Sequence, residues 1–294
     1  MDIYTIILPT YNDWKSLSIL LSQIEKNFKK TNNIFKILII NDNSSEKRDY
    51  NLNNNKFFKE VRILNLRKNI GSQKAIATGL KFISKFYKKN DDKFIIMDSD
   101  GEDDPKKIKD IIQLIRKGEK TEIITMNRSL RKESFFFSIL YELHLLATFM
   151  ITFKYIRFGN FSFLNRKVLN KIVKKKDLWF AYSATLKKHF KINASILAPR
   201  RKRISGKSKM SYLGLIGHSL NIQSIFKKNI FISYLLFFIL FVSFNIFNLF
   251  KLASFFIPFF IIIHFFIVFI NIKKEINGVN FNLLLDNIKS IEKI

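Results

Sequence analysis

Short apolar segments alternate with helix-length segments over the first 126 residues, and this alternation constrains the fold more than any other feature. Apolar runs typical of β-strands occupy residues 3–8, 35–40, 61–66, 94–97 and 122–126. Apolar residues at helical spacing, with a proline at a favoured first position in the last case, predict helices over residues 17–28, 71–86 and 105–115. Strands separated by helices form mostly parallel sheets that are covered on both faces. The chain is therefore predicted to be an α/β protein.

Polar clusters follow three of these strands. They comprise residues 10–13, 41–45 and 98–104. The carboxyl ends of parallel strands meet at one edge of a sheet, which is where such sheets bind ligands. The sequence therefore predicts that the three clusters form one site.

The third cluster is strongly acidic. Asp98 and Asp100 are two of five acids within seven residues, directly after an apolar strand. The chain has no Cys and only four scattered His, so any metal needs oxygen ligands, which suits Mg²⁺ or Mn²⁺. A solvated acidic turn is the alternative, but such clustering in a basic chain favours a site. Asp98 and Asp100 are predicted to hold a divalent metal and the diphosphate that it neutralises.

The net charge raises the question of a nucleic-acid partner. Lys and Arg number 51 against 23 Asp and Glu, a formal net charge of +28. Phosphate contacts use these residues, but no helix-turn-helix, zinc-finger or RNA-binding motif accompanies them. A coding bias that inflates Lys, Asn, Ile and Phe together, combined with attraction to anionic lipid, explains the charge better. No nucleic-acid partner is predicted.

The C-terminal third predicts a membrane anchor. Residues 230–250 and 252–272 carry no charge, and each is long enough to cross about 30 Å of hydrocarbon. Lysine pairs flank the two segments, at 227–228 and 273–274. The positive-inside rule places both flanks in the cytoplasm, which makes the segments a hairpin. A buried hairpin of a soluble protein is the less favoured alternative.

The segments around the anchor are expected to be amphipathic. Residues 134–155 and 213–226 predict helices that lie on the membrane surface. Apolar residues between 283 and 291 predict a short helix in the C-terminal tail. The N-terminus reads directly as a strand rather than a signal peptide. The expected location is the cytoplasmic membrane, as a multi-pass protein with its α/β domain and both termini in the cytoplasm.

Motifs of a known family occur in order along the chain. Residues 7–13 (ILPTYND) resemble a PxYNE loop, and residues 39–45 (IINDNSS) resemble VDDGS. Residues 69–71 with Gln73 resemble an NxG element, residues 97–105 (MDSDGEDDP) resemble MDADLQDPPE, and residues 125–128 (TMNR) stand where the family has GSR. Further on come two more segments, 159–166 (GNFSFLNR), similar to GDFRLLSR, and 203–209 (RISGKSK), similar to RxxGxSK.

These motifs are similar to those of the family 2 inverting glycosyltransferases, particularly the dolichyl- and undecaprenyl-phosphate sugar transferases. The resemblance implies a GT-A catalytic domain at residues 1–212, an interfacial helix at 213–228, the transmembrane hairpin at 229–272 and a cytoplasmic tail at 273–294. It also implies a hexosyltransferase that moves one sugar from a nucleotide sugar, with UDP the default nucleotide, to undecaprenyl phosphate for the cell envelope. The QxxRW motif and pore helices of processive synthases are absent from the sequence.

The resemblance assigns roles to individual residues. The catalytic set that it implies is Asp98, Asp100, Arg203 and Lys209, with Asp98 and Asp100 as the metal ligands. The residues implied for nucleotide-sugar binding are Pro9, Tyr11, Asp13, Asp42, Gly71, Gln73, Asp98 and Arg128. Those implied for the acceptor side are Asn160, Arg166 and Ser208.

The chain departs from the family where the acceptor is expected to bind. Asn160 replaces an Asp, so that position offers no carboxylate base. An amide suits a lipid phosphate, which is already ionised, but also a hydroxyl acceptor whose base lies elsewhere. Transfer to a hydroxyl of a lipid-linked glycan or other saccharide is therefore the alternative function. A non-enzymatic basic membrane scaffold is less favoured, and a homo-oligomer is compatible with the sequence.

Overall fold

The chain forms two compact units in a computed structural model. The structure describes residues 2–48, 56–87, 93–118, 121–129, 135–206, 212–246 and 281–294, with single positions between 262 and 269. The first unit, here the sheet unit, comprises residues 1–132, 157–209 and 281–294. The second, the helical unit, comprises residues 133–156 and 210–280. The predicted boundary near residue 212 is close to this division, but the chain enters and leaves the sheet unit more than once.

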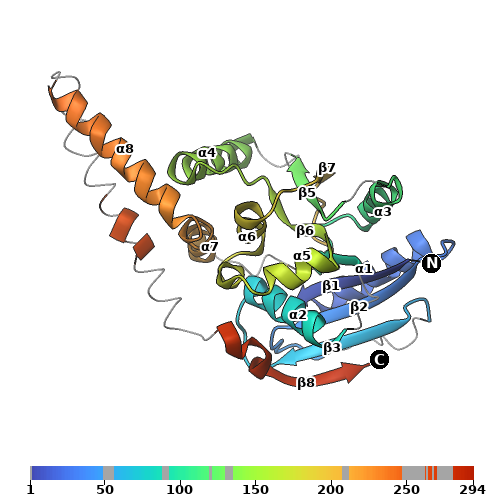
Figure 1. The fold of residues 1–294 in the computed structure, drawn as a ribbon. Coiled ribbons are helices and arrows are strands. Elements are labelled where there is room, and N and C mark those ends of the chain that lie inside the picture. The colour runs from blue at the N-terminus through green and yellow to red at the C-terminus, as the bar shows by residue number, and fades with distance from the viewer. Residues whose placement is uncertain are drawn as a thin grey trace. The chain divides into compact units, whose positions relative to one another are not determined.

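An eight-stranded sheet organises the sheet unit (Figure 1). Its strand order is β7-β5-β6-β4-β1-β2-β3-β8. The strands are β1 (Ile3–Thr10), β2 (Ile34–Asn41), β3 (Glu60–Leu66), β4 (Lys93–Ile96), β5 (Ile123–Ser129), β6 (Phe158–Asn165), β7 (Ala194–Pro199) and β8 (Ile288–Lys293). The central strands β4, β1, β2 and β3 are parallel, whereas β6 and β8 run antiparallel to their neighbours. The predicted mostly parallel α/β sheet is confirmed, and the five predicted strands correspond to β1–β5.

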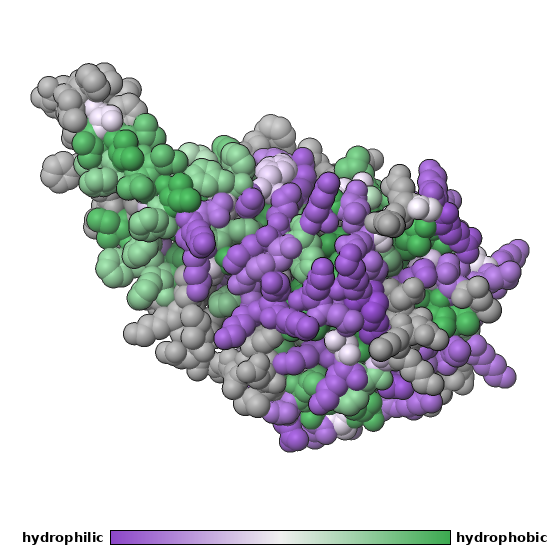
Figure 2. All heavy atoms as spheres, in the orientation of Figure 1, coloured by the Kyte–Doolittle hydropathy of each residue, from purple (hydrophilic) through white to green (hydrophobic). Residues whose placement is uncertain are grey.

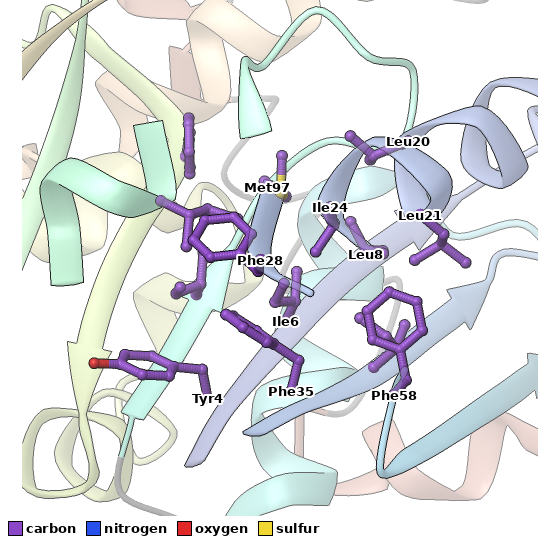
Figure 3. Close-up of a cluster of buried hydrophobic side chains, with 14 of the residues drawn as sticks. Tyr4, Ile6, Leu8, Leu20, Leu21, Ile24, Phe28, Phe35, Phe58 and Met97 are labelled. Carbon is purple, nitrogen blue, oxygen red and sulfur yellow. The ribbon is translucent and has the colours of Figure 1, made fainter. Parts of the chain in front are cut away.

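Helices cover both faces of this sheet. The helices α1 (Trp14–Phe28) and α3 (Ile108–Arg116), the latter preceded by a 3₁₀ turn at Pro105–Lys107, bury their apolar residues with one face of the strands. Figure 3 shows this core, where Phe28 and Phe35 pack at 5.0 Å between ring centroids. The other face carries α2 (Ser72–Phe86), α5 (Arg166–Ile172) and α6 (Tyr182–His189). Alternate strand residues therefore serve two cores, as a parallel sheet requires.

The helical unit contains α4 (Phe135–Thr152), α7 (Tyr212–Ser224) and α8 (Lys227–Ile246). In the described parts of the chain, no helix by itself has the length and apolar character needed to cross a membrane. Residues Ile216–Ser224 and Lys227–Ser243 meet the requirement only together, bent by 95°. The predicted transmembrane hairpin is thus not supported, and most of its second segment, 252–272, lies outside the described residues.

The C-terminal tail differs from its prediction. Residues 281–287 form a 3₁₀ helix, and residues 288–293 form β8 instead of continuing as a helix. This strand pairs antiparallel with β3, with Asn65 opposite Ser290 and Ile63 opposite Glu292. The prediction of an amphipathic helix was wrong over this strand because the open edge of β3 offers backbone hydrogen bonds, which outweigh local periodicity. The tail is therefore part of the sheet unit.

Candidate active site

The ends of β4, β1 and β2 come together at the carboxyl edge of the sheet. The Ser99 hydroxyl donates to the Pro9 carbonyl at 2.9 Å, which joins the acidic cluster to the loop after β1. The Asp42 backbone N–H donates to the Thr10 carbonyl at 2.9 Å, which joins that loop to the one after β2. The expectation that the three polar clusters share one edge is met, since the strands that carry them are neighbours in the order β4-β1-β2.

Asp98 and Asp100 lie in this edge as a partly buried carboxylate pair. Asp98 Oδ1 accepts a hydrogen bond from Asn160 Nδ2 at 2.9 Å. Asp100 Oδ1 accepts from the Glu102 backbone N–H at 3.0 Å. Burial, followed by repulsion from the Asp98 carboxylate, raises the pKa of Asp100 to about 6. Burial and the Asp98 charge thus both disfavour the ionised form of Asp100, which a bound cation would stabilise.

A divalent metal fits this pair. Carboxylate oxygens are ligands that Mg²⁺ and Mn²⁺ accept, with coordination positions left for substrate phosphates. The raised pKa of Asp100 marks a charge that a bound cation would relieve. Over the described stretches of chain, no three His, Cys, Asp or Glu side chains are grouped so that they could hold a metal ion. Asp98 and Asp100 would thus be the protein ligands, and a diphosphate would complete the set.

The raised pKa predicts a pH-dependent metal affinity. A metal binds the ionised carboxylate, so protons compete with it below the pKa of Asp100, which is about 6. The Mn²⁺ affinity should fall by about tenfold per pH unit below pH 6 and level off above it. Titration of Mn²⁺ binding by electron paramagnetic resonance between pH 5 and 8 measures this slope. A flat profile would contradict the assignment of Asp100 as a ligand.

Arg203 links the metal pair to the loop after β1. Its Nη1 donates to Asp100 Oδ2 at 3.0 Å, and its Nη2 contacts both carboxylate oxygens of Asp13 at 2.5 Å. The arginine side chain is only 14% exposed. Two backbone hydrogen bonds hold the segment in place, since the N–H groups of Arg201 and Ile204 donate to the Glu102 and Asp100 carbonyls. The predicted basic loop therefore lies over the acidic cluster.

Arg200 is a cation that the sequence prediction missed. It forms an ion pair with Glu102. Burial lowers the pKa of Arg200, but the neighbouring carboxylates of Glu102, Asp98, Asp100 and Asp103 outweigh this effect and raise it. The sequence did offer one signal for Arg200. It directly follows Pro199, the last residue of β7, and is the first residue of the basic segment.

Gly101 connects the acidic turn to the basic segment. Its φ is +79°, and a Cβ there would overlap the Ile204 side chain. Gly101→Ala is expected to cost about 1–3 kcal/mol through backbone strain and to displace the segment that carries Arg203. Since misplacement of a charged group weakens catalysis, turnover should drop at least about tenfold.

The matched control for Gly101→Ala is Gly118→Ala. Gly118 also has a φ of +79°, but a Cβ there meets nothing within 4 Å. Both variants should show a similar decrease in melting temperature, whereas only Gly101→Ala should lose activity. Equal activity in the two variants would mean that contact with Ile204 does not position the basic segment.

Asp42 holds the loop that precedes α2. Its two carboxylate oxygens accept hydrogen bonds from the backbone N–H groups of Ile70 and Gly71, each at 2.8 Å. Burial raises the pKa of Asp42, and these two hydrogen bonds oppose the rise. Gly71 precedes α2 at a φ of +85°. In this structure the Asp42 carboxylate thus binds the backbone N–H of Gly71, whereas the resemblance implies that both residues contact the nucleotide.

Asn160 belongs to a chain of oriented hydrogen bonds behind the metal pair. Its Oδ1 accepts from Gln73 Nε2 at 3.1 Å, and Gln73 Oε1 accepts from the Tyr182 backbone N–H at 2.8 Å. These partners fix the Asn160 amide with its NH₂ group toward Asp98. Behind it, Ser162 donates to the Asn160 carbonyl and pairs with the buried Tyr182 hydroxyl at 2.6 Å. Asn160 therefore contacts the metal pair directly.

The remaining predicted residues are distributed as follows. Arg166 starts α5 at the opposite end of β6 from Asn160, six residues and thus about 20 Å along the strand, and packs 4.6 Å from the Phe94 ring centroid. Its assignment to the acceptor side is not supported, because residue spacing in the motif did not reveal the direction of the strand. Tyr11 lies partly exposed in the loop after β1. Lys209, Ser208 and the side chain of Arg128 lie outside the described residues.

A mostly parallel sheet that presents paired carboxylates beside arginines at its carboxyl edge is the arrangement of a GT-A-type glycosyltransferase. The chain belongs to glycosyl transferase family 2, whose model matches residues 5–178. The predicted enzyme class is confirmed: the chain is a glycosyltransferase that uses a nucleotide sugar. No curated protein matches it.

Solved structures with the same fold have low sequence identity. Glucosyl-3-phosphoglycerate synthase from Mycobacterium tuberculosis, in complex with Mn²⁺, UDP and phosphoglyceric acid, is 12% identical, with 78% of each chain covered and a TM-score of 0.51. Mannosyl-3-phosphoglycerate synthase from Rubrobacter xylanophilus is 13% identical, with 77% of this chain and 73% of that one covered and a TM-score of 0.50. S. aureus TarS 1–349 is 15% identical, with 78% and 71% covered and a TM-score of 0.44. The likeness to the two phosphoglycerate synthases, with TM-scores of 0.51 and 0.50, supports the GT-A fold.

Proposed function

We propose that this glycosyltransferase transfers a single sugar, with inversion, from a UDP-sugar to undecaprenyl phosphate at the cytoplasmic membrane for cell-envelope glycan synthesis. The observation that carries the proposal is the orientation of Asn160. Its NH₂ group donates to Asp98, and its oxygen accepts from Gln73. An amide held in this way cannot take a proton from an acceptor. A phosphate acceptor, which is already ionised, needs no such base.

The acids that follow the metal pair have other partners. Glu102 forms an ion pair with Arg200. Asp103 accepts a hydrogen bond from the Asp98 backbone N–H at 2.9 Å. Asp104 caps the turn at Pro105–Lys107 by accepting from the Lys106 backbone N–H at 3.0 Å. If one of these carboxylates were the base for a hydroxyl acceptor, it would compete with its present contact.

The proposed reaction is one displacement at the anomeric carbon. An oxygen of the acceptor phosphate forms the new bond while the bond to the donor diphosphate breaks, and the nucleoside diphosphate leaves with the electron pair. Asp98 and Asp100 would hold Mg²⁺ or Mn²⁺, which supplies neutralisation of the diphosphate charge. Arg203 would donate to the phosphates as their charge grows, and the resemblance gives Lys209, outside the described residues, the same role. No proton has to move, because the acceptor arrives ionised.

The helical unit is proposed to bring the enzyme to the lipid. Apolar side chains on α8 are widely exposed, among them Phe231 at 66% and Phe238 at 59%, and in Figure 2 this helix is covered by hydrophobic side chains. Residues 229–250 contain no charge. An exposed apolar surface of this kind favours a membrane or another apolar partner. Hydrophilic side chains cover much of the sheet unit in the same view.

The chain connectivity restricts how such an anchor can enter a membrane. Residues 157–209 and 281–294, which flank the segment 210–280, both belong to the sheet unit, where β8 pairs with β3. A folded unit cannot lie on two sides of a bilayer. The segment from Met210 to Asn280 must therefore cross an even number of times or enter without crossing. Either arrangement keeps the catalytic unit on one side of the bilayer. We propose that this side is the cytoplasm, where Lys227 and Lys228 would face anionic lipid.

An acceptor series with one lipid tail tests the proposal. Purified full-length chain is incubated with Mn²⁺ and UDP-, GDP- or dTDP-sugars, and product formation is compared on undecaprenyl phosphate, undecaprenol and a lipid-linked saccharide. Transfer to undecaprenyl phosphate but not to undecaprenol supports a phosphate acceptor. Transfer only to a hydroxyl would replace the proposal with the hydroxyl alternative. Two results together would favour a non-enzymatic scaffold: no transfer to any acceptor, and Asp98→Ala and Asp100→Ala variants that function in the cell like the wild type.

A further inference from the structure

The C-terminal strand β8 makes polar contacts that its burial does not explain. Every residue of β8 except Ile288 is exposed. The strand is instead held by backbone pairing with β3 and by hydrogen bonds that flank it, from the Arg67 N–H to the Asn287 carbonyl and from the Ile294 N–H to the Val61 carbonyl. Burial of apolar surface contributes little to holding this strand in place, so its polar side chains and backbone pairing determine its position.

Glu292 on β8 starts a hydrogen-bonded network that runs across the sheet. Its Oε1 accepts from Asn65 Nδ2 at 2.6 Å, and its Oε2 accepts from Arg48 Nη1 at 2.9 Å. On β3, Asn65 Nδ2 also donates to the Ser290 hydroxyl at 3.1 Å. Asn65 Oδ1 then accepts from Asn41 Nδ2, on β2, at 2.8 Å. Three strands are thus connected through side chains.

The network ends in the loop that follows β2. Asn41 Oδ1 accepts from the Ser44 backbone N–H at 3.0 Å. The Ser44 hydroxyl accepts from the Asn12 backbone N–H at 2.9 Å, and Asn12 Oδ1 accepts from the Glu46 N–H at 3.0 Å. Asn12 and Asn43 both have left-handed backbone conformations, with φ of 51° and 58°. These side chains therefore hold two tight loops of the donor side in place.

We propose that Glu292 and Asn65 are positioning residues for the nucleotide half of the donor. The inference rests on the proposed function in one respect, namely that Asp42, within the loop of residues 41–46, binds the nucleoside of the donor as the resemblance implies. The Asn41 amide works in one orientation, with its NH₂ toward Asn65 and its oxygen toward Ser44. The charged Glu292 carboxylate keeps the Asn65 NH₂ group on the β8 side, which leaves the Asn65 oxygen for Asn41.

The network also accounts for Asn41 itself. An Asp at this position could accept from Ser44, but it would meet the Asn65 oxygen with another oxygen. Asn65 would then have to rotate its amide, and its NH₂ group would leave Glu292 and Ser290. Asn41, Asn65 and Glu292 therefore form one matched set.

Nucleotide binding separates this role from a structural one. Glu292→Ala in the full-length chain should raise the dissociation constant for UDP and the KM for the donor by about fivefold, with kcat unchanged to within about twofold. Glu292→Gln keeps an oxygen that accepts from Asn65 and should restore both constants. Arg48→Ala removes the ion pair alone and should behave like the wild type, because an exposed pair contributes little.

Lys293→Ala, on the same strand, serves as the matched control for the substitution itself. An unchanged UDP affinity in Glu292→Ala would overturn the proposal, as would a loss of affinity that Glu292→Gln fails to restore. A decrease in melting temperature with unchanged UDP affinity would assign Glu292 a structural role only. Because UDP binding is measured without an acceptor, failure of the undecaprenyl phosphate proposal leaves this test intact, and a wild-type chain that binds no nucleotide would refute both.

Discussion

Asp100→Asn is expected to lower turnover by about a thousandfold at saturating donor, the largest effect of any single change in this chain. Asp100 Oδ1 accepts from the Glu102 backbone N–H and Oδ2 accepts from Arg203, so the single amide oxygen of Asn can keep only one of these two hydrogen bonds. The substitution removes one negative charge, one metal ligand and one hydrogen-bond acceptor with little change of shape. The metal and the diphosphate would lose their common anchor, so the loss should appear in kcat and in the Mn²⁺ requirement.

The stability of this variant should change little, because the lost hydrogen bond and the lost buried charge have opposite effects on it. The pKa of Asp100 is raised from 3.8 to about 6 in the folded chain, so the ionised form is disfavoured there relative to the unfolded chain. That cost sets in as the pH rises from 3.8 to 6 and is fully present above 6. Asn carries no charge, so relief of this cost offsets the lost hydrogen bond, and the melting temperature at about pH 7.5 should change little.

Asp110→Asn is the matched control. Asp110 lies on α3, where it forms an ion pair with Lys107 and is 39% exposed. Its substitution should leave turnover and Mn²⁺ dependence unchanged. Wild-type turnover in Asp100→Asn would refute the metal assignment, whereas loss of turnover together with a lower melting temperature would show that the defect lies in folding.

Arg203→Ala is expected to have the second largest effect, a decrease in kcat of about a hundredfold. Arg203 is the side chain that contacts both Asp100 and Asp13, and it is 14% exposed. A guanidinium at that place can donate two hydrogen bonds to a diphosphate as negative charge accumulates on it. Arg203→Lys should recover only part of the rate, because a lysine provides a single point charge.

The same substitution should change metal binding in the opposite direction. Without nucleotide, Arg203 compensates the charge of Asp100, so it competes with a cation for that carboxylate. Removing it should tighten Mn²⁺ binding to the free enzyme by about fivefold while catalysis declines. Partial unfolding would weaken Mn²⁺ binding and lower kcat together, so tighter Mn²⁺ binding with a lower kcat cannot be explained by unfolding. Mn²⁺ titration and steady-state kinetics on one preparation measure both.

Arg116→Ala is the control for this pair of measurements. Arg116 ends α3 and donates to Asn33 at 3.0 Å, at a contact that does not involve the acidic cluster. The variant should keep both constants. If Arg203→Ala retains kcat to within about threefold, other groups hold the phosphates. Arg203 then only pairs with Asp100 and Asp13 in the absence of nucleotide.

The sequence predicted the sheet well because local periodicity encodes it. The strands from β1 to β5 and the helices α1, α2 and α3 follow from apolar runs of period two or 3.6. The strand β6 was noticed only as a motif, and β7 and β8 were missed. β8 is short, mostly exposed and rich in charge, so nothing in its own residues distinguishes it from a tail. Its strand conformation depends on the free edge of β3, which is remote in sequence.

The sequence by itself predicted the enzyme class, through the resemblance of its motifs to those of the family 2 glycosyltransferases. It also predicted the acidic pair, because the carboxyl ends of parallel strands share an edge and Asp98 and Asp100 follow one of them directly. Only the tertiary structure decided the partners of these residues. Arg203 contacts carboxylates about a hundred or more residues away, and Asn160 turns its NH₂ group toward Asp98 because Gln73 occupies its oxygen. The resemblance assigned Arg166 and Asn160 to one acceptor side, whereas β6 separates them along its length. Side-chain partners depend on strand direction and packing between distant segments, which a linear pattern does not contain.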